Sequence, residues 1–179
     1  MNKLSTHILG LFVLENIVFK DNRGGFQKIF SKNIFQENDL DSDFQEFYYS
    51  ISNQNVIRGM HFQTPPYEHT KLVFVNQGSI VDVVLDLRKH SPTYGQFFCC
   101  ELDAKDGKVL YIPKGLAHGF CAKEDNTIVN YMQTSVYNKE HDQGILYNSF
   151  GFNWQVNQPI LSERDLSFET FEQFKTPFL

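Results

Sequence analysis

The chain has 179 residues, 41% of them hydrophobic and 21% charged, which excludes a disordered polypeptide and leaves enough apolar side chains for a substantial core. Its formal net charge is -5 and it has no dense run of Lys or Arg, which excludes nonspecific nucleic-acid binding through a basic surface. It has no apolar run long enough for a membrane-spanning helix, and its odd set of three cysteines favours a reducing compartment. We expect one domain over residues 1–179.

Short segments of strand character follow one another along the chain. Residues 8–14 are apolar, and residues 44–52 are rich in aromatic side chains. The clearest segment is 79–88, where Val83 and Leu85 fall on one face and Asp82 on the other, which predicts a half-buried strand. Further strands are predicted at 71–75, 97–102, 108–112, 118–122 and 127–135, with glycines and prolines at the turns between them.

Two short helices are expected outside these strands. Ser31 is a suitable cap for a helix that continues through Phe35, and a second helix is predicted over residues 168–174. The sequence contains no internal repeat or linker. The prediction is therefore an all-β fold, either a small antiparallel β-barrel or a double-sheet jelly roll, with short peripheral helices. Small barrels of this kind can hold a ligand in their mouth.

The segment RGMHF places a cation, Arg58, and a titratable imidazole, His61, close together in an apolar setting. In a regular strand these two side chains point to opposite faces, so both serve one pocket only if the strand is irregular. Gly59 is a natural position for a bulge, and we predict one there. Lys71 lies among apolar residues, which favours an amine that faces a cavity or solvent.

Four other segments carry polar groups that can do chemistry. The turn in IPKGLAHGF leads into His118, and LSERD ends in Asp165. The segment IVNYMQTSVY contains Tyr131 and Tyr137. In FKDNRGGF, two adjacent glycines indicate a turn that presents Arg23. Each of these residues also has an ordinary structural explanation when it is taken alone.

Together, these segments resemble the dTDP-4-dehydrorhamnose 3,5-epimerase family of the cupin superfamily. The resemblance extends from about residue 8 to residue 165, most of the chain. Its segments are FKDNRGGF, VIRGMHFQTPP, KLVFVNQGSIVDVVLDLRKHSPTYG, YIPKGLAHGF, YMQTSVY and LSERD, in this order. The resemblance implies a cupin-type jelly roll and an isomerase that inverts carbons of a nucleotide-linked 4-keto sugar for surface-polysaccharide synthesis in the cytoplasm.

The resemblance also implies roles for individual residues. His61 matches the catalytic base, Asp165 the carboxylate paired with it, and Tyr131 the general acid on the opposite face. Lys71 and His118 match groups near the ketone, and Arg58 a contact to the sugar or its diphosphate. The family forms homodimers in which Arg23 reaches the diphosphate in the partner's site. The further residues that we predict to bind substrate are Phe19, Lys28, Glu46, Tyr48 and Tyr137.

This chemistry is plausible without a cofactor. Hydrogens on C3 and C5 of a 4-keto sugar are acidic, because removal of either gives an enolate at C4. A neutral imidazole takes such a proton near neutral pH, and a donor such as Lys71 stabilises the oxygen anion. We therefore expect neither a cofactor nor a metal. A metal-dependent cupin is the alternative kept open by Glu68 and His69, although His61-Phe62-Gln63 lacks the usual second His.

The chain departs from the family pattern at three positions. Glu46 and Tyr48 stand where Gln and Asn are common, and Lys28 stands where Glu is common. A reversed charge and a bulkier side chain suggest another substrate, such as a GDP-, CDP- or UDP-linked 4-keto sugar or a heptose, or else drift in a tolerant region. The alternatives are an epimerase acting at C3 alone, a sugar-nucleotide 3,4-ketoisomerase and a non-enzymatic carbohydrate-binding module. For the homodimer, the segments 44–51 and 8–14 are candidate interface elements.

Overall fold

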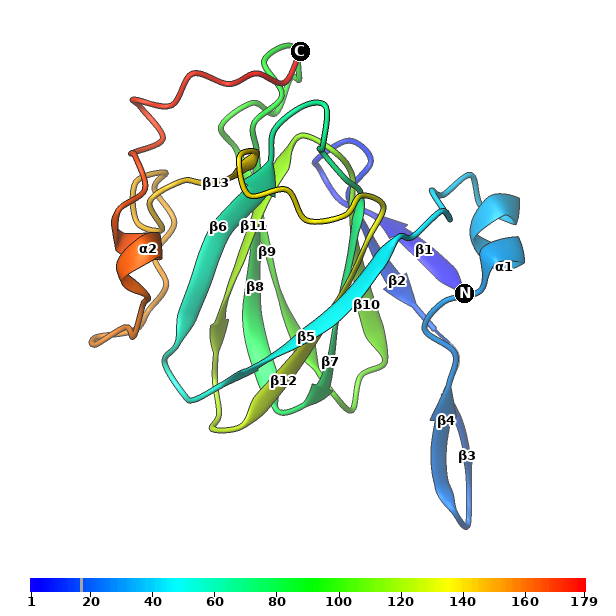
Figure 1. The fold of residues 1–179 in the computed structure, drawn as a ribbon. Coiled ribbons are helices and arrows are strands. Elements are labelled where there is room, and N and C mark those ends of the chain that lie inside the picture. Colours follow the sequence, from blue (N-terminus) through cyan, green and yellow to red (C-terminus); the bar gives the residue numbers. More distant parts are fainter. Residues whose placement is uncertain (17) are drawn as a thin grey trace.

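The computed structural model describes residues 1–16 and 18–179, and two antiparallel sheets stacked face to face form its body (Figure 1). The first sheet has the strand order β1 (Asn2–Ser5), β2 (Phe12–Glu15), β10 (Lys108–Ile112), β7 (Lys71–Gln77), β12 (Thr127–Gln133) and β5 (Glu46–Ser52). The second has the order β13 (Asp142–Gly144), β6 (Ile57–Gln63), β11 (Leu116–Ala122), β8 (Ser79–Asp86) and β9 (Phe97–Asp103). The predicted all-β, double-sheet architecture is confirmed.

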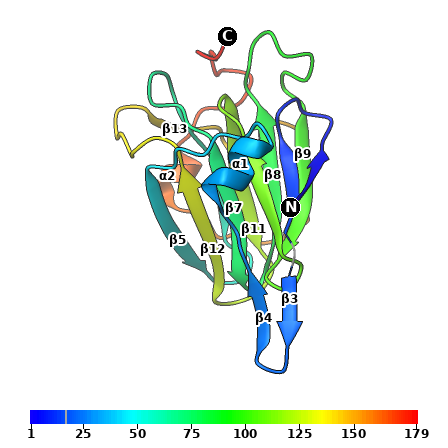
Figure 2. The same ribbon diagram turned by 90° about the vertical axis from the view of Figure 1, so that its right-hand side faces the viewer.

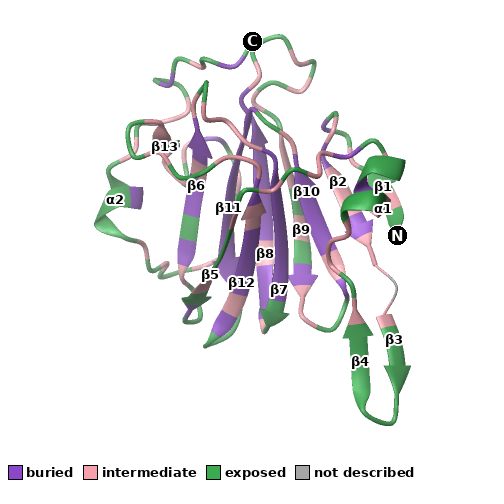
Figure 3. Ribbon diagram, turned by 45° about the vertical axis from the view of Figure 1, so that its right-hand side comes forward, coloured by how far each residue is buried: buried purple, intermediate pink, exposed green. Residues whose placement is uncertain are grey.

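A two-stranded hairpin, β3 (Val18–Asp21) and β4 (Gly24–Gln27), projects away from this body (Figure 1). Figure 3 shows the hairpin in the colour of exposed residues, whereas the central strands of both sheets are mostly buried. Its turn is formed by Asn22 and Arg23, so Arg23 lies at the tip as predicted. The hairpin therefore has little packing against its own chain.

Three hydrophobic clusters hold the body together. The first lies between the two sheets and includes Val73, Val84 and Val129. The second packs the outer face of the second sheet against the C-terminal segment, through residues such as Trp154. The third packs the first sheet against α1 (Lys32–Glu37), whose position on the outer face is visible in Figure 2. The central strands are thus covered on both faces.

Burial on both faces corrects the prediction for β8. The alternation of residues predicted a half-buried strand, but Asp82 and Asp86 are fully buried along with the apolar residues of the other face. Each carboxylate has a polar partner: Asp82 faces the buried His118, and Asp86 accepts hydrogen bonds from the partly buried Arg88, Ser91 and Thr93. Because buried charge is tolerated when it is paired and hydrogen-bonded, a polar residue in the alternation did not mark a solvent face here.

The helix predictions were right for one segment and wrong for the other. Ser31 is the N-cap residue of α1, although its side chain makes no capping hydrogen bond. No helix forms over residues 168–174, where the chain makes a turn, and the second helix, α2, is Glu163–Leu166. The Oγ of Ser162 accepts a hydrogen bond from the Asp165 N–H, a cap that a Ser three residues before an Asp could have indicated.

The turn after β8 depends on Asp86, and its removal gives a first testable prediction. Asp86 accepts from the backbone N–H and the guanidinium of Arg88, with Nη2 at 2.8 Å. Asp86→Ala leaves this cation without its buried partner, so we expect the free energy of unfolding to fall by about 3–5 kcal/mol. Urea denaturation measures the change. The matched control is Asp106→Ala, which removes an exposed carboxylate and should change stability by less than about 0.5 kcal/mol.

Candidate active site

A cavity of about 490 Å³ opens between the two sheets, with walls formed by β5, β6, β7, β11 and β12. This volume suits a sugar, and polar groups from several strands converge on it. Its lining consists of Glu46, Phe47, Tyr48, Ser50, Arg58, His61, Phe62, Gln63, His69, Lys71, His118, Phe120, Tyr131, Gln133, Tyr137, Asp142 and Arg164. Of the residues predicted from the sequence, it gathers His61, Lys71, Tyr131, His118, Arg58, Glu46, Tyr48 and Tyr137.

His61 on β6 forms a close pair with Asp165 on α2. The ring Nε2 lies 2.8 Å from Asp165 Oδ1, and Asp165 Oδ2 accepts from the Gly59 N–H. Burial would raise the pKa of Asp165, but the hydrogen bonds from His61 and Gly59 outweigh it, and the pKa is lowered from its ordinary value. Asp165 is therefore an ionised acceptor for the Nε2–H. The lone pair on Nδ1 is left to take a proton.

The strand that carries His61 contains the predicted irregularity. Phe120 pairs with Arg58 and His118 with His61, so β6 has one more residue than β11 between these pairs. Gly59 adopts φ +140°, and a side chain on it would lie 2.5 Å from the Gly119 Cα. The predicted bulge is confirmed. It lets His61 face the cavity while Arg58 lies at its rim.

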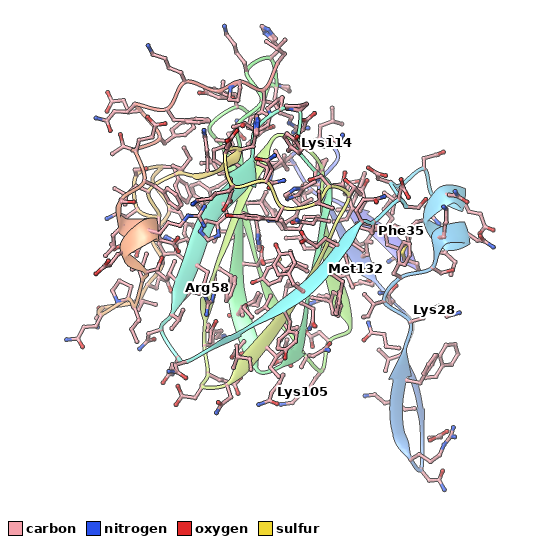
Figure 4. All side chains as sticks on the ribbon, viewed as in Figure 1. Lys28, Phe35, Arg58, Lys105, Lys114 and Met132 are labelled. Carbon is pink, nitrogen blue, oxygen red and sulfur yellow. The ribbon has the colours of Figure 1, made fainter. Side chains whose placement is uncertain are left out.

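Arg58 is held at that rim by polar groups of β5. Its Nε donates to Ser52 Oγ at 3.0 Å and its Nη2 to the Ile51 carbonyl at 3.1 Å. Figure 4 shows its side chain beside β6, on the same side of the molecule as α2. Arg164 on α2 also lines the cavity and pairs with Asp142 at 2.7 Å. The mouth therefore carries two cations, a suitable arrangement for an anionic ligand.

Two more titratable groups, Lys71 and His118, line the cavity with their side chains almost fully buried. Burial lowers the pKa of Lys71 to about 8, although Asp142 and Asp82 oppose the change. Burial also lowers the pKa of His118, so its neutral ring donates Nε2–H to Asp82 Oδ2 at 2.8 Å. Lys71 is thus an amine whose protonation changes near pH 8, and His118 is a neutral imidazole held in place by Asp82.

Tyr131 on β12 presents a phenol to the same cavity. Its ring is 6% exposed and lies at 6.3 Å, edge to face, from the His118 ring. Its hydroxyl is 3.0 Å from Ser50 Oγ, on the neighbouring strand β5. Burial raises the pKa of Tyr131 well above its ordinary value, so the phenol keeps its proton at neutral pH. It can therefore act as a proton donor.

Glu46 and Tyr48, which lie on β5, contact β12 from the side of the cavity. The Tyr48 hydroxyl donates to Gln133 Oε1 at 3.3 Å, and Gln133 Nε2 donates to Glu46 Oε2 at 2.5 Å. The ring of Tyr48 stacks on that of Tyr131. The sequence analysis did not single out Gln133 or Ser50, although both share a strand face with predicted site residues two positions away.

Gln63 and His69 are further lining residues that the sequence analysis did not place at the substrate site. Gln63 Nε2 donates to the carbonyls of Tyr67 and Val136, and its Oε1 accepts from the Asn138 N–H at 2.6 Å. It therefore ties β6 to the segment that carries Tyr137. Burial, followed by the charge of Lys71, lowers the pKa of His69 to about 3, so its ring is neutral.

Phe19, Arg23 and Lys28, which were predicted to bind substrate, do not line this cavity. Phe19 is 62% exposed on the hairpin, and Arg23 at its tip contacts Asp21. Figure 4 shows Lys28 where the hairpin rejoins the chain, away from Arg58 at the cavity. Within one chain the structure does not bring these residues to the site. Their predicted role requires a second subunit.

Glu68 and His69 are the residues that kept a metal-dependent cupin open as an alternative. Across residues 1–16 and 18–179, no three His, Cys, Asp or Glu side chains are grouped so that they could hold a metal ion. The amide of Gln63 is engaged by backbone carbonyls, and His69 Nδ1 lies 3.1 Å from Ser135 Oγ. The absence of a metal requirement stays a prediction.

Comparison with known proteins decides the family. The family model described as dTDP-4-dehydrorhamnose 3,5-epimerase matches residues 5–173. The chain belongs to this family. The Shigella flexneri dTDP-4-dehydrorhamnose 3,5-epimerase is 36% identical over 174 residues, which cover 96% of each chain. The protein is thus an isomerase with the cupin fold of its family, as predicted.

Solved structures of family members match over nearly the whole chain. A Bacillus anthracis dTDP-4-dehydrorhamnose 3,5-epimerase with TDP and PPi bound is 37% identical, with a TM-score of 0.92, covering 94% of this chain and 98% of that one. A Legionella pneumophila epimerase in complex with dTDP-4-keto-L-rhamnose is 30% identical, with a TM-score of 0.92, covering 97% and 94%. None of the helices over residues 1–16 and 18–179 is long and apolar enough to cross a membrane.

Proposed function

We propose that this epimerase inverts C3 and C5 of a dTDP-linked 4-keto-6-deoxy sugar in the rhamnose pathway, in the cytoplasm. The observation that carries the proposal is the joint presence of the His61–Asp165 pair and the Tyr131 phenol on one sugar-sized cavity. An imidazole backed by an ionised carboxylate is suited to take a proton, and a protonated phenol is suited to return one. The ligands bound to two solved relatives, TDP in one and dTDP-4-keto-L-rhamnose in the other, support this choice of nucleotide and sugar class.

In the proposed reaction, His61 removes the proton from C3 or C5 while Asp165 stabilises the resulting imidazolium. The electron pair of the broken C–H bond moves to the C4 oxygen as an enolate. Lys71 stabilises that oxygen anion with an N–H donor, which is worth about 3–4 kcal/mol when the donor is well placed. The one N–H of the neutral His118 ring is donated to Asp82, so His118 shapes the cavity without donating to this oxygen. Tyr131 then gives its proton to the other face of the carbon, which inverts the centre.

The test is incubation in deuterium oxide with dTDP-4-keto-6-deoxy-glucose, followed by NMR at C3 and C5. Deuterium entry at both carbons together with inversion is the expected result. Entry at C3 alone would assign the one-centre reaction, and migration of the ketone would assign the ketoisomerase. GDP-, CDP- and UDP-linked sugars are run in parallel, since a faster reaction with one of them would show that Glu46, Tyr48 and Lys28 mark another nucleotide. Binding of every sugar without exchange would indicate a binding module.

A second prediction concerns pH and Lys71. Because the pKa of Lys71 is lowered to about 8, its ammonium form is present below that pH and is lost as the pH rises through it. We expect the inversion rate to fall above about pH 8. Lys71→Arg should move this alkaline decline beyond about pH 10, at a lower maximal rate, because a guanidinium stays protonated there. An alkaline decline that stays at the same pH in Lys71→Arg would assign it to another group.

We also propose that the protein acts as a homodimer whose hairpins complete the partner's site. The hairpin projects from the body (Figure 1), and its residues Phe19, Phe26 and Arg23 are exposed, as are Phe47 and Tyr49 on β5. Aromatic side chains and a guanidinium suit a base and a diphosphate. Such exposed aromatic groups on a hairpin and on a strand favour contact with another chain.

Subunit complementation tests this arrangement. We expect Arg23→Ala and His61→Asn each to lose most activity, and their coexpressed mixture to recover up to about a quarter of it. Recovery arises because one site of the mixed dimer combines an intact His61 with an intact Arg23 from the other chain. If the hairpin served its own chain, every site of the mixed dimer would carry one of the two changes, and no activity would return. Tandem affinity tags isolate the mixed species.

A further inference from the structure

Tyr48 and Tyr131 form a stacked pair across two neighbouring strands. They occupy directly opposed positions of β5 and β12, with ring centroids 4.8 Å apart and planes inclined by 19°. Tyr131 is buried, whereas Tyr48 is 39% exposed and covers its partner from the cavity side of β5. Stacked aromatic pairs at this separation stabilise one another by about 0.5–1.5 kcal/mol beyond the burial of their surface.

The two hydroxyls of the pair point in opposite directions. Tyr131 contacts Ser50, two residues beyond Tyr48 on β5, whereas Tyr48 contacts Gln133, two residues beyond Tyr131 on β12. Because the strands are antiparallel, these partners lie at opposite ends of the pair. The phenol of Tyr48 is therefore not at the place of the Tyr131 phenol, and it does not duplicate that phenol's role as a proton donor.

Two consecutive hydrogen bonds, from Tyr48 to Gln133 and from Gln133 to Glu46, fix the orientation of the Tyr48 ring. Its hydroxyl donates to Gln133 Oε1, and the amide of the same Gln133 donates to Glu46 at 2.5 Å. Glu46 and Gln133 are themselves an opposed pair in the two strands. The ring of Tyr48 is thus tethered at its outer end and held flat against Tyr131, without contacting the Tyr131 hydroxyl.

We propose that Tyr48 is a positioning residue that holds the Tyr131 phenol in line with the carbon to be reprotonated. The inference rests on the proposed function, because it assigns to Tyr131 the return of the proton. Without the stacked ring, one face of Tyr131 would adjoin solvent in the cavity and its ring could tilt. A displacement of about 1 Å at a reacting group can lower a rate by about 10²-fold.

This role predicts a change that general damage to the site would not produce. His61 can remove a proton and return a deuteron on its own face, which gives exchange without inversion. Inversion requires the donor on the opposite face. Loss of the Tyr48 ring should therefore lower inversion while exchange continues, so that fewer exchange events end in inversion.

The experiment measures inversion and deuterium entry in the same NMR sample for Tyr48→Ala, Tyr48→Leu and Tyr48→Phe. We expect the ratio of inversion to exchange to fall about tenfold or more in the Ala and Leu variants. Tyr48→Phe keeps the stacked ring and should restore the ratio to within about threefold of the unmodified protein. Tyr94→Leu is the matched control, since Tyr94 is also 39% exposed but packs on Phe171, outside the cavity lining.

The thermal midpoint and dTDP affinity are measured for each variant, and Tyr48→Leu retains apolar bulk if the Ala variant is unstable. An unchanged ratio in the variants without the ring, or an equal loss of exchange and inversion, would overturn the inference. A ratio in Tyr48→Phe as low as in Tyr48→Leu would also overturn it, because the hydroxyl and not the stacked ring would then matter. Failure of the unmodified protein to exchange any proton would instead refute the proposed function.

Discussion

The His61→Asn variant is expected to lose deuterium exchange at both C3 and C5, by about 10³-fold or more relative to the unmodified protein. The reason is that every inversion begins with proton removal, and His61 is the group with a carboxylate partner 2.8 Å away and a free ring nitrogen. Asn has a similar shape but no basic nitrogen. NMR in deuterium oxide measures the exchange, and product stereochemistry measures inversion.

Two controls separate lost chemistry from lost structure. The affinity for dTDP should stay within about threefold, because the change is at the sugar end of the site. Asp165→Asn should slow exchange as well, since it removes the charge that stabilises the imidazolium. Exchange in His61→Asn at more than a tenth of the unmodified rate would show that another base operates in this cavity.

Tyr131→Phe is expected to separate the two halves of the reaction. The variant keeps the ring that stacks on Tyr48 and removes only the hydroxyl that contacts Ser50. Loss of a positioned general acid should lower inversion by about 10²–10⁴-fold, while exchange through His61 continues at a measurable rate. Time-resolved NMR follows both events in one sample.

The matched control for Tyr131→Phe is Ser50→Ala, which removes the hydrogen-bond partner and leaves the phenol. We expect inversion to fall by no more than about tenfold in this variant, since one neutral hydrogen bond is worth about 1 kcal/mol. An equal decline of exchange and inversion in Tyr131→Phe would contradict the assignment of Tyr131 as the donor on the opposite face. Full inversion in that variant would transfer the role to another group, such as Tyr137.

Much of the local structure could be predicted from the sequence because strand alternation and turn residues are local signals. The segments 108–112 and 97–102 became β10 and β9, with bounds equal or nearly equal to those expected. The bulge at Gly59 could be predicted because side chains alternate between the two faces of a regular strand. Arg58 and His61, three residues apart, would then point to opposite faces and could not serve one pocket. Here the expectation that both residues serve one site predicted a bulge in the backbone, and the register of β6 and β11 contains it.

The C-terminal segment shows where such local signals failed. Phe168, Phe171 and Phe174 have a spacing that fits a helix, yet they do not pack against one common surface. Phe168 lies against the His61 ring, whereas Phe171 contacts Tyr94 and packs with Phe174 in the cluster on the outer face of the second sheet. Burial of large aromatic rings against distant partners outweighed a weak local preference for helix.

The sequence by itself determined the strand pattern, the turn that presents Arg23 and, through the order of its motifs, the family and the residue types of the site. The pairing of Asp165 with His61 was also expected from the motifs, whereas only the tertiary structure showed that Asp82 meets His118 across 36 residues and that Tyr48 stacks on Tyr131 across a strand pair. The physical reason is that periodicity fixes the face on which a side chain lies, whereas sheet register and packing fix its neighbour. Asp82 illustrates this difference. The alternation of polar and apolar residues along its strand placed it on the solvent face, whereas in the structure it is buried beside His118.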